Sequence, residues 1–226
     1  MVSKVSERIY AESAARLLGV NWHLVEIPEP LDFQVQTDQE TFGLEVRQVF
    51  ADGEATFGSP IKRAEAENQK RLRSVAAQYY SQGGPPLSVK FLGDLTSIEI
   101  GPLVERMRCE APTAPFAHHT FSIGVVKVFV TAVPKELSDY RHWQCVDDRV
   151  GWVREATNEH LQRAVDRKST SLPLYLEKFS VVDLLLVADR TMNSGRMRST
   201  SALSVRNPGF RAVYFLSHPE SAARVG

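Results

Sequence analysis

Two neighbouring segments with apolar residues at every second position constrain this chain more than any other feature. Residues 31–37 (LDFQVQT) alternate Leu, Phe and Val with polar side chains, and residues 42–50 (FGLEVRQVF) begin with the same alternation. A period of two is typical of a strand that buries one face and exposes the other. Because only the short polar stretch 38–41 separates the two segments, the sequence predicts an antiparallel β-hairpin here.

The remaining elements place this hairpin in a mixed α/β fold. Helical periodicity and flanking glycine or proline residues predict helices at 4–18, 60–82, 97–109 and 155–170. Further extended segments are predicted at 22–27, 87–92, 121–133, 143–153, 181–188 and 210–216. Since hairpins and crossovers alternate without a clear linker, we expect one α/β domain over residues 1–226, with a mixed central sheet flanked by helices.

Composition excludes several classes of protein. The chain has 27 basic and 27 acidic residues, so a nucleic-acid surface has to be a local patch rather than a field over the whole molecule. Its only cysteines, Cys109 and Cys145, form neither a disulfide framework nor the spacing of a zinc site. Charged residues interrupt segment 1–19, and the longest apolar run, 181–188, is too short to cross a bilayer. We therefore expect a cytoplasmic protein with no membrane partner.

Two carboxylates lie where the predicted hairpin can bring them together. Asp32 alternates with Phe33, and Glu45 alternates with Leu44, so both acids project away from the apolar face. Two hard oxygen ligands, a backbone carbonyl and waters suit an octahedral Mg²⁺ ion, which activates water and neutralises charge on a phosphodiester. The alternative for Glu45 is a surface salt bridge with Arg47 or with a cross-strand partner.

The same residues carry a resemblance to a known family. Pro30-Leu31-Asp32, a short turn, and Glu45-Val46-Arg47 in a strand followed by a helix resemble the signature of the PD-(D/E)XK nuclease superfamily. The preceding helix carries Glu7, and many members place a glutamate there. The alternative for Glu7 is an acid that is favoured near the helix N-terminus by the helix dipole and has no role in a site. Over residues 1 to about 93, the resemblance implies a restriction-endonuclease-like α-β-β-α-β core and a nuclease that holds Mg²⁺ or Mn²⁺ through Asp32 and Glu45.

The chain departs from the family pattern at Arg47, which stands where the signature has a lysine. An arginine stays protonated, so it can clamp a phosphate but is a poor base for the attacking water. Other members place the lysine elsewhere, commonly on the following helix. On helix 60–82, Lys62 and Gln69 flank the apolar stripe, so we expect Lys62 to assist the water and Gln69 to orient it or bind the substrate backbone. A solvated lysine in the first helical turn is the alternative for Lys62.

Arginines in the polar segment 189–209 suggest a second contact with substrate. Arg190, Arg196 and Arg198 lie among Ser, Thr and Asn residues, and guanidinium groups match phosphate oxygens well. The alternative is a solvated loop without a ligand. No aromatic residues alternate with these arginines to stack on bases.

Three functions therefore remain open from the sequence. The first is a Mg²⁺-dependent phosphodiesterase that acts on nucleic acid. The second keeps the nuclease-like fold without catalysis, as a binding or assembly module, with Arg47 marking the loss. The third is a small-molecule metal hydrolase of unrelated fold. The sequence does not determine the oligomeric state, and it is compatible with a homodimer.

Overall fold

The alternating segments form the predicted hairpin. In the computed structural model, β2 (Phe33–Gln36) and β3 (Thr41–Gln48) pair antiparallel, with Phe33 opposite Leu44. Both side chains are buried, so the apolar positions of the two strands share one face of the sheet, as their period of two predicts. The structure describes residues 4–52, 59–146, 153–200 and 202–226.

The chain divides into two compact units. The first contains Met1–Pro60 and Trp152–Gly226, and the second contains Ile61–Gly151. Along the chain, the second unit is therefore inserted between two parts of the first. That residues 1–226 form one domain, in which both units would unfold together, stays a prediction.

The first unit is built on a six-stranded mixed sheet in the order β1-β2-β3-β9-β11-β12. β1 to β3 pair antiparallel, β3, β9 and β11 run parallel, and β12 returns antiparallel. The predicted mixed sheet is thus confirmed. The further strands are β1 (His23–Glu26), β9 (Val182–Asp189), β11 (Ala212–His218) and β12 (Ser221–Arg224).

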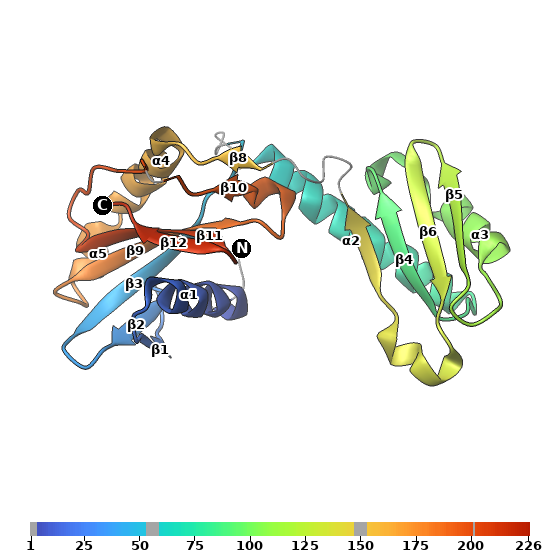
Figure 1. The fold of residues 1–226 in the computed structure, drawn as a ribbon, viewed down its shortest axis with the longest axis horizontal. Coiled ribbons are helices and arrows are strands. Elements are labelled where there is room, and N and C mark those ends of the chain that lie inside the picture. Colours follow the sequence, from blue (N-terminus) through green and yellow to red (C-terminus); the bar gives the residue numbers. More distant parts are fainter. Residues whose placement is uncertain (1–3, 53–58, 147–152, 201) are drawn as a thin grey trace. The chain divides into compact units, whose positions relative to one another are not determined.

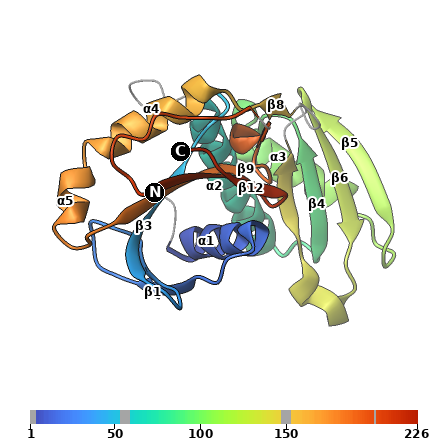
Figure 2. The same ribbon diagram turned by 60° about the vertical axis from the view of Figure 1, so that its left-hand side comes forward.

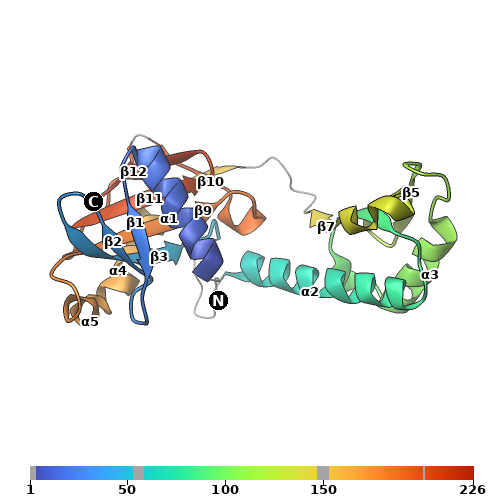
Figure 3. The same cartoon turned by 90° about the horizontal axis from the view of Figure 1, so that it is seen from below.

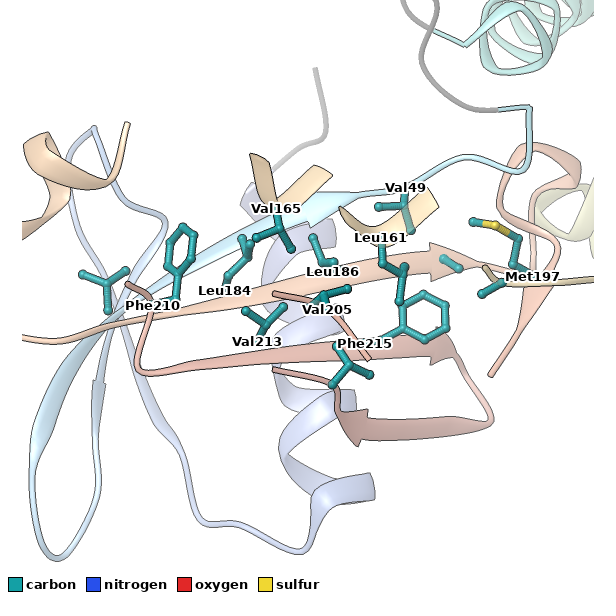
Figure 4. Close-up of a cluster of buried hydrophobic side chains, with 14 of the residues drawn as sticks. Val49, Leu161, Val165, Leu184, Leu186, Met197, Val205, Phe210, Val213 and Phe215 are labelled. Atoms are coloured by element: carbon teal, nitrogen blue, oxygen red, sulfur yellow. The ribbon is translucent and has the colours of Figure 1, made fainter. Parts of the chain in front are cut away.

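Helices cover both faces of this sheet, as Figures 1 and 2 show: α1 (Lys4–Leu18) on one side, α4 (Asn158–Ser169) and α5 (Leu172–Leu176) on the other. The central strand β9 is buried on both faces, which explains its continuous apolar sequence. Figure 4 shows the core on the α4 side, where Leu161 and Val165 belong to one cluster with Leu184, Leu186 and Phe215. The predicted mixed sheet flanked by helices therefore forms in this unit.

The ends of two predicted helices follow from local chemistry. Gly19 adopts φ +69° after α1, and the N–H groups of Gly19 and Val20 donate to the carbonyls of Arg16 and Ala15. This paired C-terminal bonding favours glycine because a left-handed residue is required. The helix predicted over 155–170 ends as α4 at Ser169, and the short α5, which contains Pro173, follows it.

The second unit has its own four-stranded sheet in the order β5-β6-β4-β7. Figures 2 and 3 show α2 and α3 together on one side of it, and their apolar residues share a core with alternate residues of β4 and β6. Its elements are α2 (Pro60–Ser81), β4 (Leu87–Leu92), η1 (Leu95–Ser97), α3 (Ile100–Glu110), β5 (His118–Ile123), β6 (Val126–Ala132), η2 (Lys135–Tyr140) and β7 (Trp143–Val146).

Several elements differ from the sequence prediction. The single strand predicted at 121–133 is wrong: β5 and β6 form a hairpin, because Gly124 adopts φ +54° and turns the chain. The strand at 87–92 forms, but its partners are β6 and β7, so it is not beside β2 and β3 in a core of residues 1 to about 93. The sequence prediction did not include the short strands β8 (Arg154–Glu155) and β12. The segment 189–209, predicted as a loop, contains the short strand β10 (Met197–Arg198) and the short helix η3 (Asn193–Gly195). The predicted element at 143–153 forms as β7, and its part from 147 to 152 lies outside the described residues.

No helix in the described parts of the chain has both the length and the apolar composition needed to cross a membrane.

Candidate functional site

Asp32 and Glu45 meet at the point where β2 stops pairing with β3. The last paired residues are Phe33 and Leu44, and the backbone N–H of Val46 instead donates to Asp32 Oδ2 at 2.9 Å. The carboxylate of Asp32 thus replaces a strand carbonyl at this position. Asp32 and Glu45 are only 7% and 4% exposed. Two acids are therefore held together inside the edge of the hairpin.

Two lysines from different helices neutralise these acids. Lys4, in the first turn of α1, places its Nζ 2.6 Å from Asp32 Oδ1 and 3.5 Å from Glu7 Oε2. Lys168, near the end of α4, forms an ion pair with Glu45. The helices on the two faces of the sheet therefore each contribute a cation to the same pair of acids.

Burial shifts the protonation of the acids. Burial first, and then the charge of Asp32, raise the pKa of Glu45 to about 7, although the Lys168 ammonium opposes the shift. Burial and the charge of Asp32 also raise the pKa of Glu7. Burial by itself lowers the pKa of Lys168, but the charge and hydrogen bond of Glu45 outweigh it and raise that pKa. The site therefore holds three carboxyl groups that compete for protons or cations.

Asp32 and Glu45 are the residues that would hold a divalent metal ion at this site. Asp32 and Glu45 offer the hard oxygen donors that Mg²⁺ accepts, and a dication would relieve their mutual repulsion. Glu7 Oε2 is buried and, among the described residues, has no hydrogen-bond partner, although Lys4 lies within ion-pair distance. No group of three or more His, Cys, Asp or Glu side chains in the described ranges is arranged to hold a metal. The remaining coordination positions would then fall to water or substrate, as is usual for Mg²⁺.

The raised pKa of Glu45 predicts how stability changes with pH. Folding raises this pKa from the ordinary 4.5 to about 7, so the folded state binds more protons than the unfolded state between these values. Without metal, the free energy of unfolding should therefore fall as the pH rises through this window, with Glu45 contributing on the order of 2 kcal/mol.

Urea denaturation in EDTA, repeated across this pH range, measures the effect. Glu45→Gln, which stays neutral, should remove this part of the decline, so the difference in stability between wild type and variant should itself change with pH. Glu7 also titrates from a raised pKa, and its contribution cancels in that difference. Parallel curves for the two proteins would show that Glu45 titrates normally.

The other residues predicted for the site lie in different places. Arg47 is half-buried on the same face of β3 as Glu45, and its charge lowers the pKa of Lys168, so it lies near that lysine. Lys62 and Gln69 are on α2 in the second unit, where Lys62 pairs with Glu65 at 3.7 Å. Their predicted roles beside Glu45 stay predictions.

Two of the three predicted phosphate-binding arginines form ion pairs with acids. Arg190 forms an ion pair with Glu220, and Arg198 forms one with Glu155. Arg196 follows η3, and its N–H donates to the carbonyl of Asn193. A phosphate bound by Arg190 or Arg198 would therefore compete with a carboxylate.

Lys4 and Lys168 are site residues that the sequence prediction missed, and for Lys168 a signal was present. Leu161, Val165 and Lys168 follow the i, i+4, i+7 spacing of one helix face, and the two apolar residues are fully buried. A lysine that continues a buried stripe needs a carboxylate partner. The same reasoning that selected Lys62 on helix 60–82 also selects Lys168 on helix 155–170.

Compared with family models, curated proteins and solved structures, the chain matches none of them. Its function is therefore inferred from the geometry around Asp32 and Glu45.

Proposed function

We propose that this chain is a Mg²⁺- or Mn²⁺-dependent phosphodiesterase that acts on nucleic acid. The observation that carries the proposal is the pair of buried acids Asp32 and Glu45, set at the edge of a hairpin with Lys168 against Glu45. Strongly shifted pKa values concentrate at functional sites, and burial together with the charge of Asp32 raises the pKa of Glu45 to about 7.

Each residue has a distinct role in this proposal. Asp32 and Glu45 would hold the metal ion, which when bound supplies charge to activate water and to neutralise the phosphodiester. Lys168 would assist the attacking water, the task that the sequence assigned to Lys62. Arg47, half-buried near Lys168, would hold a phosphate oxygen, which a guanidinium does well.

The order of elements in the first unit supports a restriction-endonuclease-like core. The succession α1, β1, β2, β3, β8, α4, α5 and β9 places an acid before β2, an acid in β3 and a lysine on α4, the first of the two helices between β8 and β9. β9 then lies parallel to β3. In this proposal the core consists of these elements rather than of residues 1 to about 93, and the second unit is an insertion between β3 and α4.

Cleavage assays with the purified full-length chain test the proposal. Single-stranded, double-stranded and branched DNA and RNA would be incubated with Mg²⁺, with Mn²⁺ and with EDTA. We expect metal-dependent cleavage of at least one substrate and none in EDTA, because the acids cannot act on phosphate without the cation. Absence of cleavage on every substrate would reject the catalytic function.

A second function is favoured by one feature of the site. Lys4 and Lys168 already neutralise both acids, and Arg47 replaces the signature lysine. A chain in which ammonium groups take over the role of the metal would be a nuclease-like binding or assembly module. Nucleic-acid binding without any cleavage and without any change on adding Mn²⁺ would favour this module.

A further inference from the structure

Within the second unit, the described residues place helices on only one face of the sheet. Residues that alternate along β6 illustrate the division, since Val128 and Val130 are fully buried in the core with α2 and α3, whereas Lys127 is exposed and Phe129 is half-buried. We name the second set of positions the open face. Across the four strands it consists of Ser88, Lys90, Leu92, His118, Thr120, Ser122, Lys127, Phe129, Thr131, Gln144 and Val146.

The open face has an aromatic ring between two lysines. Thr120, Phe129, Lys90 and Gln144 form one row across the strands. Lys127 lies two residues before Phe129 on β6, with its Nζ 5.2 Å from the ring centroid. Lys90 is directly opposite Phe129, where cross-strand Cβ atoms are about 5 Å apart. Both lysines are exposed.

The charge of this face has one sign. β4, β5, β6 and β7 contain neither Asp nor Glu, so neither lysine has an acidic partner within the strands of the sheet. This contrasts with the whole chain, in which acidic and basic residues are equal in number. The other exposed residues of the open face carry hydroxyl, imidazole or amide groups, which form hydrogen bonds with the polar edges of bases; they are His118, Thr120, Ser122 and Gln144.

We propose that the open face binds single-stranded nucleic acid. A base stacks on Phe129, while Lys90 and Lys127 contact the phosphates on either side. Proteins that bind single strands combine an aromatic platform with a basic surface, and every base offers a face for stacking. A duplex hides its base faces within the stack, so Phe129 favours the single strand over the duplex. This binding needs no metal, and it does not depend on the function proposed for Asp32 and Glu45.

Fluorescence anisotropy in EDTA tests the proposal with the full-length chain and labelled oligothymidylate, oligouridylate and a DNA duplex. Cleavage by the proposed metal site is excluded in EDTA, so binding is measured by itself. We expect wild type to bind the single strands with a Kd of roughly 1–100 µM at physiological salt, and to bind them more tightly than the duplex.

Two variants and one matched control assign the face. Lys90→Gln with Lys127→Gln should weaken binding at least about tenfold and reduce the salt slope by about 1.4, since each single-strand phosphate contact contributes about 0.7. Phe129→Leu should weaken binding by roughly tenfold with little change in that slope, because it removes only the stacking. The control, Lys70→Gln with Arg73→Gln, removes the same charge from exposed positions of α2, on the other side of the sheet, and should bind like wild type.

The proposal is overturned if wild type prefers the duplex, if it fails to bind single strands, or if the open-face variants bind like the control. Circular dichroism and thermal unfolding of each variant establish that the sheet is intact. Asp32→Asn separates the two proposals: it should lose Mn²⁺ binding while it keeps oligonucleotide binding in EDTA.

Discussion

Replacing Glu45 by Gln, or Asp32 by Asn, is expected to reduce metal-dependent cleavage by at least about a thousandfold, which corresponds to about 4 kcal/mol of activation free energy. Each substitution keeps the shape of the side chain but removes one of the two negative charges that would hold the cation in the proposed function. A metal at such a site contributes several kcal/mol of charge stabilisation in the transition state. Both variants should also bind Mn²⁺ much more weakly in isothermal titration calorimetry.

An exposed acid of the same hairpin serves as the matched control. Asp38 lies in the turn between β2 and β3, and Asp38→Asn should leave both cleavage and Mn²⁺ affinity unchanged. Urea denaturation would establish that all three variants are folded, which matters because Asp32→Asn alters the acceptor for the Val46 N–H. Cleavage that persists at the wild-type rate in both site variants would show that the activity arises elsewhere.

Lys168→Met is expected to reduce cleavage by about a hundredfold or more, because it removes a positioned positive charge, and loss of one donor that stabilises developing charge costs about 10²–10³ in rate. Lys168 is the lysine that contacts Glu45, and its side chain is 21% exposed. Methionine keeps most of the volume and the packing of the aliphatic chain without the charge. Because the Lys168 ammonium lowers the pKa of Glu45, its loss should also move the onset of Mn²⁺ binding to higher pH.

Lys62→Met provides the comparison that distinguishes the two candidate lysines. Lys62 pairs with Glu65 on α2, so its loss should change the cleavage rate by less than about threefold, within the range of surface substitutions. Rates would be measured at several pH values, with Lys70→Met as a second control on an exposed lysine of α2. The reverse result, a large loss in Lys62→Met alone, would assign the role to Lys62, as the sequence predicts.

Local patterns in the sequence were sufficient for the hairpin and for the placement of its acids. A period of two depends only on which side of the strand is buried, so Asp32 and Glu45 could be assigned to the side away from Phe33 and Leu44 without any knowledge of the fold. Helix limits such as Pro60 and Gly19 were also predictable, because each is determined by backbone preferences within a few residues.

Partners that are distant in sequence were not predictable. The strand at 87–92 has the alternation expected of a strand in any sheet, and nothing in its pattern indicates that it pairs with β6 and β7 while β9 pairs with β3. Periodicity reports that a face is buried, but not what buries it. For the same reason the sequence prediction named Lys62, close to Glu45 along the chain, and did not consider Lys168.

The sequence by itself thus determined the mixed α/β class, the hairpin and its two adjacent acids. Only the tertiary structure decided that the chain divides into two units, and that a lysine 123 residues away neutralises Glu45. The physical reason is that local propensities act over a few bonds, whereas an ion pair between β3 and α4 depends on packing of the helix against the sheet through Leu161 and Val165. That packing, rather than any motif, brings Lys168 to the acids.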